Sequence, residues 1–365
     1  MREVPERVRR LPEQYFTALL ARVAAAAAAE GESLVDLGRG NPEVGPPEHV
    51  VRALSDSAAR TDVHGYAPFA GLPALKEAIV ARYGEVYGVE LDPEREVAVL
   101  PGSKTGLMEF ALCAVERGGT IVLPDPGYPD YFSAVALANA KSISFSGFDV
   151  QADALYLNYP SNPTAAAVPD QLFEDAVRWA ERSEAWILHD FAYGDLVFDG
   201  RLPQSFLAVE GARDVGIELF SMSKSYGMAG WRLGFALGNS ELVRRIETVQ
   251  DHAFAGIFRP IQEAGIAALS GPQESVEARR AGYERRRDRA LHALGGVEAQ
   301  SQGTFFVWFR LPAGVTVERL LVEHRIALAP GEGFGTRGAG WARLSLAVSD
   351  ETLERGLERL RTVFG

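Results

Sequence analysis

The segment from Ile217 to Lys224 reads IELFSMSK: a short, mostly apolar run is followed at once by two serines, a methionine and a lysine. Similar runs, rich in β-branched or aromatic residues, occur at Val97–Leu100, Thr120–Leu123, Ala154–Asn158, Trp186–His189 and Leu233–Leu237. Amphipathic stretches with helical spacing separate several of them, at 71–83, 103–115 and 169–180. Strands that alternate with helices form a mostly parallel sheet with helices on both faces, so we expect an α/β fold.

The pattern changes after Ser240. Two long helices are expected at 240–270 and 272–294, and a strand-rich tail follows at Thr304–Phe309, Ile326–Ala329 and Arg343–Ala347. This change indicates a second, smaller α+β unit that the N-terminal segment completes. We expect a large domain of residues 46–280 and a small domain of residues 1–45 and 281–365.

Composition favours a small-molecule protein. Of the 365 residues, 47% are apolar and 24% are charged, which suffices for a core and is unlike a disordered chain. The net charge of −12 argues against binding nucleic acid or anionic lipid. A single cysteine, Cys113, excludes an intrachain disulfide and is typical of the cytoplasm.

No apolar run reaches the length of about 18 residues that a membrane span requires. Arg7, Arg9 and Arg10 before the alanine-rich run 23–29 imitate a signal peptide, but Arg22 interrupts the apolar region, so we expect an amphipathic helix. The six histidines are scattered without metal-ligand spacing, and we expect no metal site.

Polar residues follow five of the expected strands directly. They are Ser103 and Lys104 after the first, Tyr128 after the second, Asn162 after the third, Asp190 and Tyr193 after the fourth, and Lys224 after the fifth. In an open parallel sheet, ligands bind beyond the carboxyl ends of the strands. We therefore expect a phosphate-type turn, an aromatic ring, an amide, a carboxylate and a lysine to converge on one crevice.

Lys224 stands out among the four lysines of the chain. Lys76 and Lys141 are interpreted as solvated surface residues, and Lys104 lies in a turn where its backbone N–H matters more than its ammonium group. Lys224 alone follows a buried strand, with small hydroxyl neighbours and a glycine-rich continuation. A desolvated amine of this kind is neutral enough to form a Schiff base.

Asp190 is expected to be buried, because it ends an apolar strand between His189 and Phe191. Such an aspartate can simply cap a turn, but a buried carboxylate requires a cationic partner. A protonated pyridine nitrogen would serve: at 4 Å and an effective dielectric constant near 20, the attraction is about 4 kcal/mol. That attraction would keep a heteroaromatic ring cationic and electron-withdrawing. Taken singly, Tyr66, Tyr128, Tyr193 and Arg343 are also compatible with ordinary core or surface positions.

The sequence FSMSKSYGMAGWRLG, residues 220–234, resembles the lysine segment of class I/II aminotransferases, which are pyridoxal-phosphate enzymes of the aspartate-aminotransferase fold. The runs HGYAPFAGLPALKEAI, PGSKTGL, DPGYPDY, NYPSNPT and HDFAYGDLVFDG resemble further blocks of the family in the same order. The likeness extends from GRGNPE at Gly38 to WARLSLAVSD at Asp350, and is nearest to the bacterial branch with alanine, methionine and LL-diaminopimelate aminotransferases.

The resemblance implies roles around the cofactor ring. Lys224 would hold pyridoxal 5'-phosphate as a Schiff base and act in catalysis with Asp190 and Tyr193. Asp190 would pair with the pyridinium nitrogen, Tyr193 and Asn162 would hydrogen-bond the phenolic oxygen, and Tyr128 would stack on the ring face.

The resemblance also implies the phosphate and substrate contacts. The phosphate would be held by Ser103, Lys104, Ser221, Ser223 and Arg232. Tyr66 matches a residue that reaches the phosphate of a neighbouring subunit, which implies a homodimer with shared active sites. Arg343 would bind the substrate α-carboxylate as a bidentate fork, helped by Asn162, Gly40 and, as a lid, Tyr15.

Two departures from the family pattern stand out. Ala165 occupies the position of a usual glycine, so we expect the turn there to avoid positive φ. Between Phe145 and Leu155 the chain is shorter than the usual spacing of these elements by about 20 residues. This shortening affects the expected substrate-side loop and the neighbouring sheet edge rather than the cofactor residues.

The resemblance implies transfer of an amino group from an L-amino acid to a 2-oxo acid. Phe254, Ile257 and Phe258 favour an alanine- or methionine-like donor, with 2-oxoglutarate or pyruvate as acceptor. Arg259 leaves diaminopimelate or N-succinyldiaminopimelate open, and a C–S lyase on the same fold is a further alternative. An inactive regulatory protein on this fold is disfavoured, because the acidic chain has no room for a DNA-binding domain.

Overall fold

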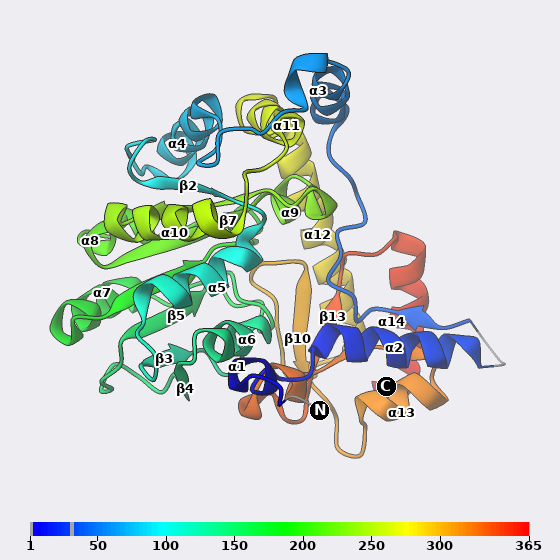
Figure 1. The fold of residues 1–365 in the computed structure, drawn as a ribbon. Coiled ribbons are helices and arrows are strands. Elements are labelled where there is room, and N and C mark those ends of the chain that lie inside the picture. The colour runs from blue at the N-terminus through cyan, green and yellow to red at the C-terminus, as the bar shows by residue number, and fades with distance from the viewer. Residues whose placement is uncertain (1–2, 30–32, 365) are drawn as a thin grey trace.

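The structure is a computed structural model that describes residues 3–29 and 33–364. Its centre is a seven-stranded sheet in the order β2-β8-β7-β6-β5-β3-β4 (Figure 1). The strands are β2 (Val97–Leu100), β3 (Thr120–Leu123), β4 (Lys141–Ser144), β5 (Ala154–Asn158), β6 (Trp186–Asp190), β7 (Gly216–Ser221) and β8 (Gly234–Gly238). β8 is antiparallel to β2 and β7, and the other pairs are parallel. The expected mostly parallel sheet is confirmed.

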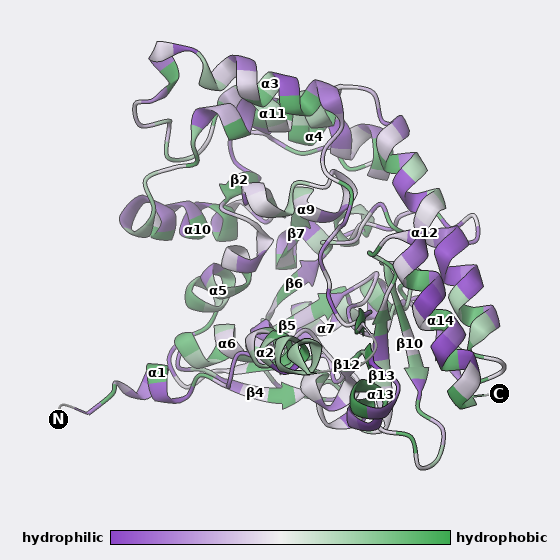
Figure 2. Cartoon of the chain, turned by 90° about the vertical axis from the view of Figure 1, so that its right-hand side faces the viewer, coloured by the Kyte–Doolittle hydropathy of each residue, from purple (hydrophilic) through white to green (hydrophobic). Residues whose placement is uncertain are grey.

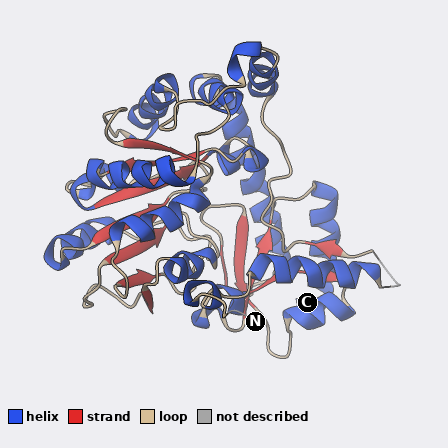
Figure 3. Ribbon diagram, viewed as in Figure 1, coloured by secondary structure: helices blue, strands red, loops and turns tan. Residues whose placement is uncertain are grey.

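Helices cover both faces of this sheet (Figure 3). Apolar residues of α5, α6 and α10 form the core on one face, and those of α3, α4, α7, α8 and α11 form the core on the other. β2, β5 and β7 are buried along their whole length, as strands covered on both sides must be. The bounds are α3 (Glu48–Ala58), α4 (Pro73–Tyr87), α5 (Ser103–Ala114), α6 (Asp130–Leu137), α7 (Leu172–Ser183), α8 (Ala212–Val215), α10 (Ser240–Ala253) and α11 (Arg259–Ser270).

A smaller unit contains an antiparallel sheet in the order β12-β13-β10-β9 and a parallel pair β1-β11. Its strands are β1 (Val35–Asp36), β9 (Ala299–Gln300), β10 (Phe306–Arg310), β11 (Ile326–Ala327), β12 (Ala329–Pro330) and β13 (Trp341–Ser345). Its helices are α2 (Tyr15–Ala28), α12 (Glu274–Ala293), α13 (Val317–Glu323) and α14 (Asp350–Phe364), whereas the short α1 (Glu6–Arg9) contacts α6 beside the large sheet. Figure 2 shows α12 and α14, largely hydrophilic, at the outside of this unit.

The expected domain boundary at residue 280 lies inside α12, which continues without a break from Glu274 to Ala293. The division into residues 46–280 and the two flanking segments therefore stays a prediction. Residues 1–2, 30–32 and 365, which the smaller domain was expected to include, lie outside the described residues.

The alanine-rich N-terminal segment forms α2, as the amphipathic pattern predicts. Leu19 and Val23 are its buried residues, and they pack against Trp308 and Phe334 of the smaller unit. Within residues 3–29 and 33–364, no helix combines the length and the apolar character that crossing a membrane requires.

The single helix expected over residues 240–270 is wrong. α10 ends at Ala253, Phe254 is extended with φ −149°, and α11 begins only at Arg259. Pro260 explains the new start, because proline lacks a backbone N–H and is tolerated only in the first turn of a helix.

The edge strand β4 was missed, because its sequence KSIS is exposed and carries no apolar pattern. The connection from β4 to β5 covers only residues 145–153 and contains no helix. Phe145, Phe148 and Val150 of this short connection pack on the core beside α7, where Trp179 Nε1–H donates to Val150 O at 2.8 Å.

The expectation that Ala165 avoids positive φ is wrong: its φ is +54°. The left-handed conformation costs a non-glycine residue about 1–2 kcal/mol, so the surrounding structure must impose it. The Ala165 carbonyl accepts hydrogen bonds from the N–H groups of Gln302 (2.7 Å) and Gly303 (3.1 Å), and the methyl group is fully buried. These tertiary contacts hold the turn although the glycine is absent.

We predict that Ala165→Gly changes the free energy of unfolding by less than about 1 kcal/mol. Relief of the φ strain, about 1–2 kcal/mol, is offset by a lost buried methyl group of about 0.8 kcal/mol and by greater unfolded-state freedom of about 0.4–1 kcal/mol. The control Ala176→Gly, at a buried position inside α7, has no strain to relieve and should lose about 2 kcal/mol. Urea unfolding compares the two, and equal losses would contradict this explanation.

Candidate active site

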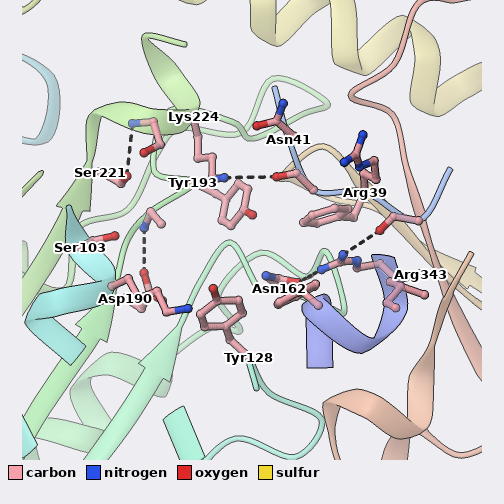
Figure 4. Close-up of a pocket in the computed structure, with 18 of the residues that line it drawn as sticks. Arg39, Asn41, Ser103, Tyr128, Asn162, Asp190, Tyr193, Ser221, Lys224 and Arg343 are labelled. Atoms are coloured by element: carbon pink, nitrogen blue, oxygen red, sulfur yellow. Dashed lines mark hydrogen bonds between the residues drawn. The ribbon is translucent and has the colours of Figure 1, made fainter. Parts of the chain in front are cut away.

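A cavity of about 750 Å³ lies where the large sheet's carboxyl-terminal loops meet the smaller unit (Figure 4). All the candidate site residues line it except Tyr15 and Tyr66. Those that line it are Gly40, Ser103, Lys104, Tyr128, Asn162, Asp190, Tyr193, Ser221, Ser223, Lys224, Arg232 and Arg343. The strand-end residues thus converge as the sequence predicts.

Lys224 belongs to α9 (Met222–Ser225), a single helical turn that follows β7 directly. Ser221 caps this turn, because its Oγ accepts the N–H of Ser223 at 3.2 Å. The Lys224 Nζ lies 3.5 Å from Gly40 O and 5.8 Å from the centre of the Tyr193 ring. Burial, and then the positive charges of Arg343 and Arg232, lower the pKa of Lys224 from 10.5 to about 8, against the opposing effect of Asp190. A large fraction of this amine is therefore neutral near pH 8.

Asp190 ends β6, and its carboxylate is held by two donors. Tyr131 O–H donates to Oδ2 at 2.8 Å, and the N–H of Ala192 donates to Oδ1 at 3.2 Å. Burial raises the pKa of Asp190, and the two hydrogen bonds oppose that rise. No Lys or Arg lies within ion-pair distance of Asp190 among the described residues, so the carboxylate retains the capacity to pair with a buried cation.

The N-terminus of α5 forms the positively polarised end of the cavity. Gly102, with φ +86°, turns the chain into this helix, and a side chain at this position would collide with the Arg232 guanidinium. Lys104 Nζ lies beside it, paired with Asp130 Oδ2 at 2.9 Å. Free N–H groups, two serine hydroxyls and a guanidinium at one point suit an anion such as phosphate.

Arg343 lies on β13 and is fully buried. Its Nη1–H donates to Asn162 Oδ1 at 2.6 Å, and its Nη2–H donates to Gly38 O at 3.3 Å. The guanidinium lies 3.8 Å from the centre of the Phe306 ring, and its Nε has no hydrogen-bond partner among the described residues. A Cβ at Gly40 would lie 3.1 Å from Phe306 Cζ, so glycine keeps this approach open. The Arg343 guanidinium is thus held in a fixed position from which it can bind a carboxylate.

The two remaining candidates lie elsewhere. Tyr15 O–H donates to Pro330 O at 2.9 Å and its ring packs on Phe334, so its neighbour Phe16 lines the cavity in its place. Tyr66 is 88% exposed on the surface of the chain.

Several lining or supporting residues were missed by the sequence reasoning. Tyr131 of α6 supports Asp190, and the signal was its position three residues after Tyr128, which precedes that helix. Helical spacing on the apolar face of α2 could also have indicated four residues that line the cavity: Phe16, Leu19, Leu20 and Val23. No sequence pattern pointed to the lining residues Asp36, Arg39, Asn41, Leu107 and Phe306.

The cavity residues fit pyridoxal phosphate. An anion site, a buried carboxylate that lacks a cation and a depressed-pKa amine line one cavity, and they match the phosphate, the ring nitrogen and the aldehyde of that molecule. No cluster of three or more metal-binding side chains occurs in the part of the chain that the structure describes.

Comparison with known proteins identifies the family. A family model described as "Aminotransferase class I and II" matches residues 32–360. The L-glutamine–4-(methylsulfanyl)-2-oxobutanoate aminotransferase of Bacillus subtilis is 42% identical over 376 aligned positions, which cover 97% of this chain and 94% of that protein. The LL-diaminopimelate aminotransferase of Moorella thermoacetica is 37% identical, with 98% of both chains covered.

Solved structures agree. Substrate-bound BacF from Bacillus subtilis superimposes with a TM-score of 0.93 at 35% identity, covering 100% of this chain and 99% of that chain. A Thermus thermophilus aspartate aminotransferase variant gives a TM-score of 0.91 at 28% identity, covering 100% of both. The chain therefore belongs to the class I and II aminotransferases: it is a pyridoxal-phosphate-dependent transaminase of the aspartate-aminotransferase fold.

Proposed function

We propose that this transaminase moves the amino group of an L-amino acid with an alanine- or methionine-like side chain to 2-oxoglutarate or pyruvate, with Lys224 as the catalytic lysine. One observation carries the proposal. The Lys224 amine and the Arg343 guanidinium line the same cavity and contact the same segment, at 3.5 Å from Gly40 O and 3.3 Å from Gly38 O. This separation suits an amino acid held by its carboxylate at Arg343 with its Cα toward the amine.

The cofactor would be held by residues of the large sheet. Asp190, supported by Tyr131, would pair with the ring nitrogen, and Tyr193 with Asn162 would hydrogen-bond the phenolic oxygen. Tyr128 would cover one face of the ring. The phosphate would be bound by Ser103, Lys104, Ser221, Ser223 and Arg232, and by Tyr66 of a neighbouring subunit. When bound, pyridoxal phosphate supplies an aldehyde that condenses with amines and a ring that withdraws electrons.

Lys224 would carry the proton in the reaction. Its lowered pKa makes the neutral amine, which is the nucleophile and the base, available near pH 8. As a base it would remove the proton at the substrate Cα, and as an acid it would return that proton to the cofactor's aldehyde carbon. Arg343 would fix the carboxylate meanwhile, with Asn162 holding the guanidinium and Gly40 leaving room.

The lining favours an apolar substrate side chain. Phe16, Leu19, Leu20 and Val23 of α2 form one wall of the cavity. The B. subtilis relative at 42% identity carries the name of a glutamine and methylsulfanyl-oxobutanoate aminotransferase, and AlaC of Escherichia coli, 35% identical, that of a glutamate-pyruvate aminotransferase. The second candidate is a diaminopimelate or N-succinyldiaminopimelate aminotransferase, which the M. thermoacetica relative favours.

We propose a homodimer on the basis of an exposed aromatic patch, which we define as His64, Tyr66, Phe69, Phe254 and Phe258. The rings of His64 and Phe258 lie 5.8 Å apart, and those of Tyr66 and Phe69 lie 6.4 Å apart. Paired aromatic rings that remain exposed on the surface of one chain are typical of a protein interface. Tyr66 would then contribute to the partner's phosphate site rather than to its own.

A cytoplasmic location is proposed from cysteine usage. Cys113, the only cysteine, is partly buried within α5, and burial raises the pKa of its thiol to about 11. Such a thiol is unreactive and forms no structural crosslink. A chain of this size without disulfides is typical of a reducing compartment.

A half-reaction screen tests the substrate proposal. The purified protein loaded with pyridoxal phosphate is mixed with one amino acid at a time, and the visible absorbance change of the cofactor is followed. Alanine or methionine should convert it, Lys224→Ala should slow conversion by at least about 10²-fold, and Lys141→Ala, at an exposed lysine of β4, should not change it. Conversion by diaminopimelate alone would favour the second candidate.

Release of ammonia and pyruvate from cysteine without an acceptor would indicate a lyase. Full multiple-turnover transamination by Lys224→Ala would refute the role of Lys224.

Lys224→Met should stabilise the cofactor-free protein. Below about pH 8 the folded protein keeps this amine charged in a site that disfavours the charge, which costs about 3 kcal/mol. Between pH 8 and 10.5 the folded state binds fewer protons than the unfolded state, so wild-type stability rises with pH. The advantage of the Met variant should therefore shrink by about 1.4 kcal/mol per pH unit above pH 8. Urea unfolding at several pH values measures it, and a pH-independent difference would contradict the lowered pKa.

Sedimentation equilibrium tests the homodimer. The wild type should have twice the monomer mass. Phe258→Glu, which places a charge in the aromatic patch, should shift it toward monomer, because burying that charge is unfavourable. Leu202→Glu, at an exposed apolar residue outside the patch, is the control and should remain dimeric. A monomeric wild type would exclude the shared site.

A further inference from the structure

Three arginines line the cavity, and the roles above use Arg232 and Arg343 but not Arg39. Arg39 lies between Gly38, whose carbonyl accepts from Arg343, and Gly40, whose carbonyl faces Lys224. Its side chain lines the cavity. Figure 4 shows Arg39 and Arg343 on the side of the cavity away from Ser103 and Asp190, that is, away from the proposed phosphate and ring-nitrogen contacts. A substrate bound at Arg343 therefore has Arg39 as its neighbour.

Arg39 is only loosely held. Its Nε lies 3.7 Å from Asp36 Oδ2, and the guanidinium makes no hydrogen bond to any other residue that the structure describes. The side chain is 60% exposed, whereas Arg343 is buried and engaged by Asn162 and Gly38. An arginine with unused donors at the edge of a binding cavity is suited to a carboxylate, which it can bind through two parallel hydrogen bonds.

The other arginine considered for an acidic side chain is already paired. Arg259 Nε donates to Glu263 Oε1 at 2.7 Å, and Arg259 does not line the cavity of its own chain. Arg39 lines the cavity together with Arg343, and the third arginine there, Arg232, is assigned to the phosphate. The apolar wall of α2, which includes Leu19 and Leu20, lies in the same cavity, so an extended apolar chain and a distal charge can both be accommodated.

We propose that Arg39 is the specificity residue for the far end of the substrate, where it binds the distal carboxylate of a dicarboxylic amino acid or oxo acid of glutamate length. Asp36 is its counter-ion when the substrate lacks that carboxylate. An apolar substrate side chain packs on the residues of α2 that line the cavity. One cavity thereby binds both the apolar amino acid and the dicarboxylic oxo acid. This inference rests on the proposed function.

Asp36 gives the proposal a second test, of opposite sign. Its Oδ1 accepts the N–H of Gly38 at 2.9 Å while Oδ2 faces Arg39. In Asp36→Asn the amide oxygen can retain the bond to Gly38, but the negative charge that competes for Arg39 is gone. Removing the competitor should strengthen binding of a dicarboxylate, whereas removing Arg39 should weaken it.

The experiment is calorimetric titration of the enzyme loaded with pyridoxal phosphate, using the unreactive acids glutarate and pentanoate. Arg39→Gln should weaken glutarate binding by at least about tenfold and leave pentanoate within about twofold, because only glutarate has the second carboxylate. Asp36→Asn should tighten glutarate by about two- to fivefold. The control Arg178→Gln removes an arginine from a similar i,i+3 Asp–Arg pair on the surface of α7 and should change neither.

Kinetics supply the second readout. Arg39→Gln should raise the KM for 2-oxoglutarate about tenfold with kcat nearly unchanged, and leave the KM for pyruvate unaltered, because a distal contact is made equally in the ground state and the transition state. Equal losses for glutarate and pentanoate, or no loss for glutarate, would overturn the role of Arg39. The titration needs no turnover: selective glutarate binding without transamination would refute only the proposed function, and transamination without selectivity only this inference.

Discussion

A primary amine that is buried beside positive charges gives up its proton more readily than the same amine in water, because its charge is not solvated. Lys224 is in this position, with Arg343 and Arg232 lowering its pKa further. Asp190 opposes them, yet no ion pair within 4.0 Å joins it to Lys224 in the described structure. If the two groups were in contact, they would form an ion pair. The amine would then stay protonated, and the carboxylate would already have a cationic partner. Their separation keeps an amine that can react and an acid that can pair with a bound cation.

The two halves of the fold maintain that separation. β6 and β7 are adjacent parallel strands with Asp190 opposite Leu219, so Asp190 and the turn that carries Lys224 leave the same sheet edge. Arg343 comes from β13 of the smaller unit, and both Arg343 and Lys224 contact carbonyl groups of the segment Gly38–Gly40. The position of Arg343, on the substrate side of the cavity, therefore depends on how the smaller unit packs against the large sheet. The residues on the cofactor side come from the large sheet and its loops.

The sequence was sufficient where the signal is local. A polar residue directly after an apolar run, as at Asp190 or Lys224, must lie at a strand end, and parallel strands bring such ends together. The sequence contained no pattern that predicts which distant segments contact one another. Lys76, interpreted as solvated, is buried against Glu247 at 2.7 Å, 171 residues away. Tyr131 reaches Asp190 across 59 residues, and the φ of Ala165 is set by Gln302 and Gly303. In each case tertiary contacts override a local preference.

The shortened connection after β4 shows why the cofactor side tolerates change at the sheet edge. β3 pairs with β4 on one side and with β5 on the other, so the register of β5 depends on β3 and β6, not on the chain that links β4 to β5. Tyr128 follows β3 and Asn162 follows β5, and both reach the cavity without contributions from residues 145–153. The alignment of 376 positions with the B. subtilis relative exceeds the 365 residues of this chain, so the relative carries segments that are absent here. Phe145, Phe148 and Val150 pack on the core within the short connection, so this edge of the core is covered without a longer segment.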